Sequence, residues 1–71
     1  MPLTLMQVGE KGIIRKVSGG EDTRRYLGNL GFVSQASLEV VNKLNENVIV
    51  SICGSRIALN ADMARHIMVN I

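Results

Sequence analysis

Few side chains in this sequence are of types that do chemistry. The chain has one histidine, one cysteine and six scattered acidic residues. A catalytic site needs a nucleophile beside a base, or a pair of carboxylates, and no spacing here brings such groups together. The glycine pairs Gly9/Gly12 and Gly19/Gly20 lack the Lys-Ser/Thr ending of a phosphate-binding loop. We therefore expect a protein that is not an enzyme and needs no cofactor.

Three residues are candidate metal ligands, namely Cys53, Asp62 and His66. Thiolate, carboxylate and imidazole groups can all hold a transition metal, but so dispersed a set falls short of ordinary coordination. Cys53 is the last residue of a predicted strand, among apolar residues, where a free cysteine usually behaves as a small buried hydrophobe. A regulatory domain that senses a divalent metal ion through these residues remains an alternative hypothesis.

The segment from Arg24 to Phe32 has the residues of a docking surface. Arg24 and Arg25 are adjacent on a predicted helix and point about 100° apart, so at least one is exposed. Such a pair is either a solvated helix face or a partner contact. A glycine inside a helix lowers its stability by roughly 1 kcal/mol relative to alanine. Gly28 therefore suggests that another backbone comes close at this position, either from the rest of the domain or from a partner. Leu27 and Phe32 are either core residues or the rim of a cleft.

Composition indicates one compact domain over residues 1–71. Hydrophobic residues make up 46% of the chain and charged residues 20%. The single cysteine cannot form an intrachain disulfide, which favours a reducing compartment. We see no signal peptide, and the longest aliphatic run, 48–50, is far short of the ~20 residues of a membrane helix. The sequence thus predicts a soluble cytoplasmic protein with at most an indirect membrane role.

Basic residues do not form a nucleic-acid-binding pattern. Eight lysines and arginines are interleaved with six acidic residues, and the only aromatic residues are Tyr26 and Phe32. Proteins that bind nucleic acids usually cluster their positive charge and add stacking aromatics. We expect no nucleic-acid partner.

Alternating hydrophobic residues predict five short strands, at 12–18, 37–44, 48–53, 56–59 and 67–71. A helix is expected over 24–30, capped by Asp22 or Thr23 and ended by Gly31, with helical turns at 4–7 and, capped by Asn60, at 61–65. In so short a chain, five short strands leave no exposed edges if the sheet closes into a barrel. The predicted class is mainly β, a small SH3-like barrel of about five strands with one or two short helices.

The alternation also predicts faces and turns. Across a turn at 45–47, the inward set is Leu38, Val40, Val48, Val50 and Ile52. Ile13 and Val17 are expected to share one face of the first strand, opposite Ile14. Gly54-Ser55 fits a two-residue turn, and the strand at 67–71 is an exposed edge through which copies could self-associate.

Three blocks of the sequence resemble the FeoA family. The Arg24–Val33 segment (RRYLGNLGFV) is similar to the family's arginine-rich Leu-x-x-Leu-Gly segment. Residues 8–14 (VGEKGII) resemble its opening strand, and 54–59 (GSRIAL), followed by Ala64 and Ile67, its closing block. The chain departs from the family with Ser34-Gln35 in place of Pro-Gly, and with Asn60 where a basic residue is common.

The resemblance implies an SH3-like cytoplasmic accessory of FeoB, the membrane ferrous iron transporter with a cytoplasmic G domain. The implied function is regulation of ferrous iron uptake through binding of the cytoplasmic portion of that transporter. Similar domains end iron-dependent transcriptional repressors, which keeps the metal-sensing alternative open. On this hypothesis the partner contacts are Arg24, Arg25, Leu27, Asn29 and Phe32.

Overall fold

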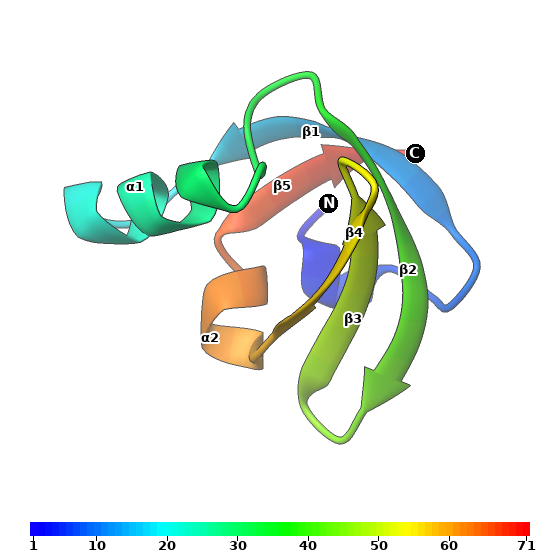
Figure 1. Cartoon of the computed structure of the whole chain (residues 1–71). Helices are drawn as coiled ribbons and strands as arrows, with labels where there is room; N and C mark the ends of the chain where they lie inside the picture. The colour runs from blue at the N-terminus through cyan, green and yellow to red at the C-terminus, as the bar shows by residue number, and fades with distance from the viewer.

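The computed structural model describes all residues, 1–71, and contains five strands and short helices (Figure 1). The elements in chain order are η1 (Leu3–Leu5), β1 (Lys11–Val17), α1 (Glu21–Asn29), β2 (Ser37–Leu44), β3 (Asn47–Ile52), β4 (Ser55–Leu59), α2 (Ala61–Ala64) and β5 (Ile67–Asn70). The mainly β class and the strand count predicted from the alternation are therefore confirmed.

The strands form one antiparallel sheet in the order β4-β3-β2-β1-β5. The sheet coils so that β1 and β5 face the β2-β3-β4 side across a common core (Figure 1). Because β4 and β5 do not pair, hydrogen bonding does not close the sheet into the complete barrel that the sequence predicted.

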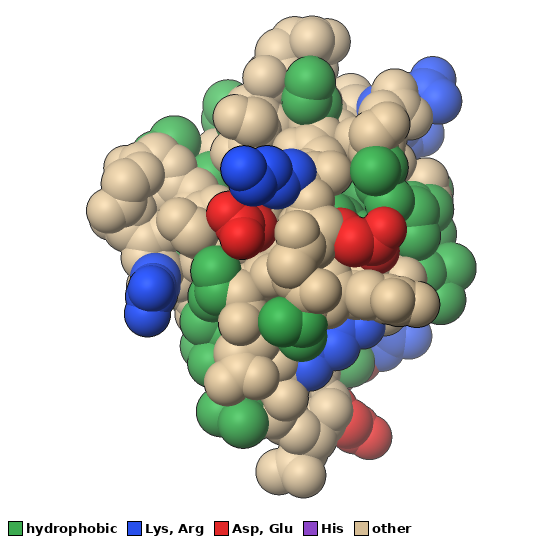
Figure 2. Space-filling model, turned by 90° about the vertical axis from the view of Figure 1, so that its right-hand side faces the viewer, with side chains coloured by type: hydrophobic (Ala, Val, Ile, Leu, Met, Phe, Trp, Pro, Cys, Tyr) green, Lys and Arg blue, Asp and Glu red, His purple; other side chains and the backbone are tan.

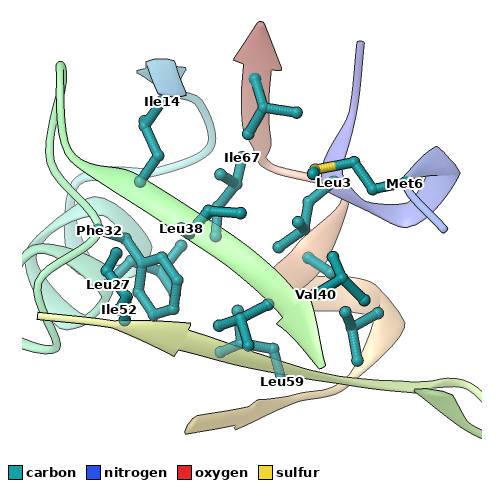
Figure 3. Packing of buried hydrophobic residues seen from close by; sticks show 14 residues of the cluster. Leu3, Met6, Ile14, Leu27, Phe32, Leu38, Val40, Ile52, Leu59 and Ile67 are labelled. Carbon is teal, nitrogen blue, oxygen red and sulfur yellow. The ribbon is translucent and has the colours of Figure 1, made fainter. Parts of the chain in front are cut away.

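The core lies inside this coiled sheet and contains fourteen buried hydrophobic residues (Figure 3). All five residues that the alternation placed inward on β2 and β3 belong to it, so the predicted faces of that hairpin are confirmed. No polar or charged residue is buried. Apolar packing on a hydrogen-bonded sheet therefore holds the fold, with no covalent cross-link.

A bulge in β1 changes the faces predicted for that strand. The pairing register of β1 with β5 shifts between Ile14 and Lys16. Ile14 is buried, whereas Ile13 is 47% exposed and Val17 packs against the core. Ile13 and Val17 therefore do not share an environment, because the extra residue of a bulge interrupts the period of two.

The two hairpin turns lie one residue away from their predicted positions. The β2–β3 turn is Asn45-Glu46, because Asn47 already pairs with Leu44. The β3–β4 turn is Cys53-Gly54, with φ of 51° and 77° at the two positions. Two positive φ values are typical of the type I′ turn, whose twist matches that of the flanking strands.

Helix α1 begins three residues before its predicted start and ends one residue before its predicted end, with the predicted stop at Gly31. Its N-cap is Gly20, and neither Asp22 nor Thr23 caps it, since both lie inside the helix. Gly31 has a φ of 105°. The N–H of Gly31 donates to Gly28 and that of Phe32 to Leu27, both at 3.0 Å, which is the hydrogen-bond pattern of a Schellman stop. The predicted left-handed glycine is thus confirmed.

The other two helical turns also differ in detail from the prediction. The N-terminal turn is a 3-10 helix over Leu3–Leu5 rather than 4–7, and its N-cap, Pro2, makes no side-chain cap hydrogen bond. Asn60 does cap α2: its side-chain oxygen accepts the Met63 N–H at 2.9 Å. This confirms its predicted role and explains a polar, uncharged residue at this position.

Candidate functional site

Helix α1 is the most loosely held element and the main candidate for a binding surface. It connects β1 to β2 along the chain and projects to one side of the sheet (Figure 1). Leu27 is its only buried residue, and its N-cap makes no side-chain hydrogen bond. A helix of nine residues has little stability of its own in water. Most of its surface is therefore available, and one side chain anchors it to the core.

The two arginines of α1 differ in their surroundings. Arg25 lies 2.9 Å from Glu21 and 3.8 Å from Asp22, with 64% of its side chain exposed. Arg24 is exposed and makes no ion pair or side-chain hydrogen bond. Exposed ion pairs contribute little to stability. Arg24 is thus an unpartnered cation on the helix, whereas Arg25 would have to exchange partners in order to bind another carboxylate.

Asn29 and Tyr26 complete the exposed part of α1. Asn29, one of the predicted contacts, is exposed at the last position of the helix. Tyr26 is 52% exposed and is not among the predicted contacts. Its position could have been anticipated, because a residue adjacent to buried Leu27 is rotated about 100° from the core face. An exposed aromatic next to an arginine is typical of protein interfaces.

Leu27 and Phe32 are not surface contacts, so the prediction is wrong for these two residues. Leu27 is 0% and Phe32 1% exposed. Both side chains point inward and lie next to Ile52 of β3 (Figure 3). The Schellman stop brings them together, because it folds the chain back over the end of α1. These residues position the helix and present no area to a partner.

Gly28 does not mark a close approach of the sheet, contrary to the sequence-based interpretation. A Cβ added at this position would meet no atom within 4 Å outside its own helix. The φ of Gly28 is not in the left-handed region, so its backbone conformation does not require glycine. The fold itself therefore gives no reason for a glycine here.

The three candidate metal ligands do not meet. The structure has no group of three or more His, Cys, Asp or Glu residues that could hold a metal ion. Asp62 pairs with Arg65 on the surface of α2. The His66 ring lies against Gly19, and its Nδ1 is 3.4 Å from the Ser18 hydroxyl.

Cys53 is exposed in the β3–β4 turn, and its Sγ lies beside Gly31. The expectation of a buried cysteine is wrong, because the two-residue turn takes it out of the strand alternation.

Charge is mixed on the face shown in Figure 2, which is the right-hand side of Figure 1. Basic side chains there lie beside acidic ones and are separated by apolar and polar atoms. A protein that follows a nucleic-acid backbone presents a continuous basic groove, and this face has none.

Neither α1 nor any other helix is long and apolar enough to cross a membrane.

Comparison with known proteins agrees with this fold. The model of the FeoA domain matches residues 1–71, the whole chain. The chain belongs to the FeoA family. A curated relative from Methanocaldococcus jannaschii, named as a candidate Fe(2+) transport protein A, is 34% identical over 68 residues, which cover 96% of this chain and 83% of the relative.

Solved structures of FeoA proteins superpose closely on this family member. A crystal structure of an iron uptake regulatory protein, FeoA, has a TM-score of 0.90 and 31% identity, with 97% of this chain and 93% of that chain covered. The zinc complex of Stenotrophomonas maltophilia FeoA, described as an SH3 domain protein, has a TM-score of 0.86 and 24% identity over 99% of this chain and 89% of that one. The predicted SH3-like fold and FeoA membership are confirmed.

Proposed function

We propose that this chain binds the cytoplasmic portion of a FeoB-type ferrous iron transporter and regulates Fe²⁺ uptake, with α1 as the docking element. Membership of the FeoA family and the iron-transport names of its relatives support the pathway. The observation that carries the docking element is that α1 projects from the sheet on one buried anchor. The protein acts by binding and not by catalysis, and it is cytoplasmic, with membrane contact only through the transporter.

The contacts on α1 follow from exposure and charge. Arg24 is the primary contact, because it is exposed and has no partner within the fold. Arg25 and Asn29 lie together about 100° and 140° around the helix from Arg24, opposite the buried Leu27, and both are exposed. Arginine is enriched among the residues that dominate binding energy at interfaces. The partner surface that fits α1 therefore carries a carboxylate opposite Arg24.

Gly28 adds an independent reason to place a partner at α1. It lies four residues after Arg24, on the same face of the helix, with open space around it. A glycine that the fold does not require lowers the stability of the free protein. A partner backbone in contact with this position would account for it, since any side chain here would hold that backbone away.

The test is a titration of the transporter's cytoplasmic portion with the full chain, in the apo, GDP and GTP states. Arg24→Glu is expected to weaken binding by about tenfold or more, because it reverses the charge of a contact residue. Arg15→Glu is the matched control: Arg15 is also an exposed arginine but lies on β1, and its variant should change affinity by less than about threefold. Absence of binding in all three nucleotide states would contradict the proposal. Equal losses of affinity in Arg24→Glu and Arg15→Glu would show that α1 is not the docking element.

A further inference from the structure

The two edges of the sheet differ in how they are covered. The outer edge of β5 is paired with the N-terminal residues: Pro2 bridges Met68, and the Met1 carbonyl accepts the Val69 N–H at 2.7 Å. The Met1 amino group in turn donates to the Val69 carbonyl at 2.8 Å. The terminal strand is therefore not the free edge that the sequence predicted. That edge is β4, which pairs with β3 on one side and with no strand on the other (Figure 1).

The β3–β4 turn determines which groups of β4 point away from the sheet. In a two-residue type I′ hairpin the flanking residues, Ile52 and Ser55, form a hydrogen-bonded pair. Every second residue of β4 therefore bonds to β3, and those between, Arg56 and Ala58, direct their N–H and C=O groups outward. No turn, loop or cap hydrogen bond uses these groups.

The β4 edge lacks most of the features that keep edge strands from pairing. Natural edges are protected by prolines, by bulges or by several charges. Strand β4 (SRIAL) has no proline, its register with β3 is regular over all five residues, and Arg56 is its only charge. The β1–β5 and β2–β3 pairs, in contrast, both contain a register shift. Strand β4 is thus the one regular, uncovered edge of the sheet.

We propose that β4 pairs antiparallel with β4 of a second copy of this chain, centred on Ile57. In that register each Arg56 lies opposite Ala58 of the second copy, and the outward groups of these residues form four main-chain hydrogen bonds. No two arginines face each other directly. Ile57 packs against the core but is only partly buried. It meets Ile57 of the second copy, which covers its remaining surface.

The short edge sets the strength of this association. Only two residues per copy contribute outward hydrogen bonds, so the interface is smaller than the ~1,200 Å² of a standard stable complex. We expect a weak dimer that forms with increasing concentration, in the range of about 0.1 to 1 mM.

Two substitutions at position 58 should change the dimer Kd in opposite directions. Each dimer holds two Arg56–Ala58 pairs, so Ala58→Glu adds two opposite-charge pairs and Ala58→Lys adds two like-charge pairs. By sedimentation equilibrium, Ala58→Glu should lower the dimer Kd by about tenfold and Ala58→Lys should raise it by about as much. Position 58 is exposed, so both variants should retain the circular dichroism spectrum of the parent.

Cross-linking tests the register, in a Cys53→Ser background. In the proposed register, Ile57 lies opposite Ile57 of the second copy in a non-hydrogen-bonded pair. The two Cα atoms are then about 4.5 Å apart, which is within disulfide range. Ile57→Cys should therefore oxidise to a covalent dimer. Ser55→Cys is the control: it lies opposite Leu59 of the second copy, about 13 Å from Ser55 of that copy, and should not cross-link.

Three outcomes would overturn the proposal. One is a chain that stays monomeric up to about 1 mM in the parent and in Ala58→Glu. Another is a dimer that is insensitive to charge at position 58 and does not cross-link through position 57. The third is a monomeric parent whose binding to the transporter's cytoplasmic portion is lost in Ala58→Pro, which would assign the edge to an extended strand of that partner.

Discussion

Replacing Gly28 with alanine is expected to stabilise this protein while weakening its binding to the transporter. The added methyl group meets no atom within 4 Å outside the helix, so no steric cost opposes it. Alanine is favoured over glycine in a helix by about 0.5–1 kcal/mol, and Gly28 lies near the end of α1, where the lower value applies. For a domain of this size a gain of about 0.5 kcal/mol corresponds to a rise in Tm of about 2–4 °C, measured by thermal circular dichroism.

Gly54 provides the matched control for Gly28. A Cβ there also meets nothing within 4 Å, but the φ of Gly54 is +77°, in the left-handed region. Alanine in that conformation costs about 1–2 kcal/mol, so Gly54→Ala should lower Tm by roughly 4–8 °C or more. Because both sites have open space, the opposite signs isolate backbone conformation as the cause.

A binding measurement distinguishes the effect of Gly28 on stability from its effect on affinity for the partner. If a partner backbone contacts α1 at this position, Gly28→Ala should reduce affinity for the transporter's cytoplasmic portion although the domain is more stable. Gly54→Ala lies outside α1 and should leave affinity unchanged at temperatures where it is folded. A Gly28→Ala variant that is destabilised as much as Gly54→Ala would refute the reasoning, since it would mean that the space around Gly28 is occupied.

Three further variants test the elements around the site. Gln35→Gly should raise the unfolding free energy by about 1 kcal/mol in urea titrations, because Gln35 has a φ of 76°, in the left-handed region that glycine adopts without strain. Asn60→Ala should lower it by about 1 kcal/mol through loss of the cap on Met63, whereas Asn60→Asp should retain most of the stability. Leu27→Ala should cost about 2–5 kcal/mol and remove hydrogen-exchange protection from α1, since Leu27 is the only buried residue of that helix.

Much of the fold follows from local patterns in the sequence. The alternation over residues 37–52 determines the faces of the β2–β3 hairpin, because a strand exposes its side chains with a period of two. Gly31 ends α1 and Asn60 begins α2, since both caps depend only on residues a few positions away. The family blocks are also local, and they were sufficient to indicate membership of the FeoA family.

Contacts between segments distant in the sequence determine which residues of the candidate site are exposed. Leu27 and Phe32 are buried because they join the core cluster that also contains Ile52 of β3, and no spacing around α1 encodes that packing. Gly28 has open space for the same reason, because the sheet packs against another face of the helix. The sequence by itself thus determined the elements, their caps and the family. Only the tertiary structure determined that Arg24 and Asn29 remain on the surface of α1 and that β4 is the free edge, because exposure depends on which remote residues cover a position.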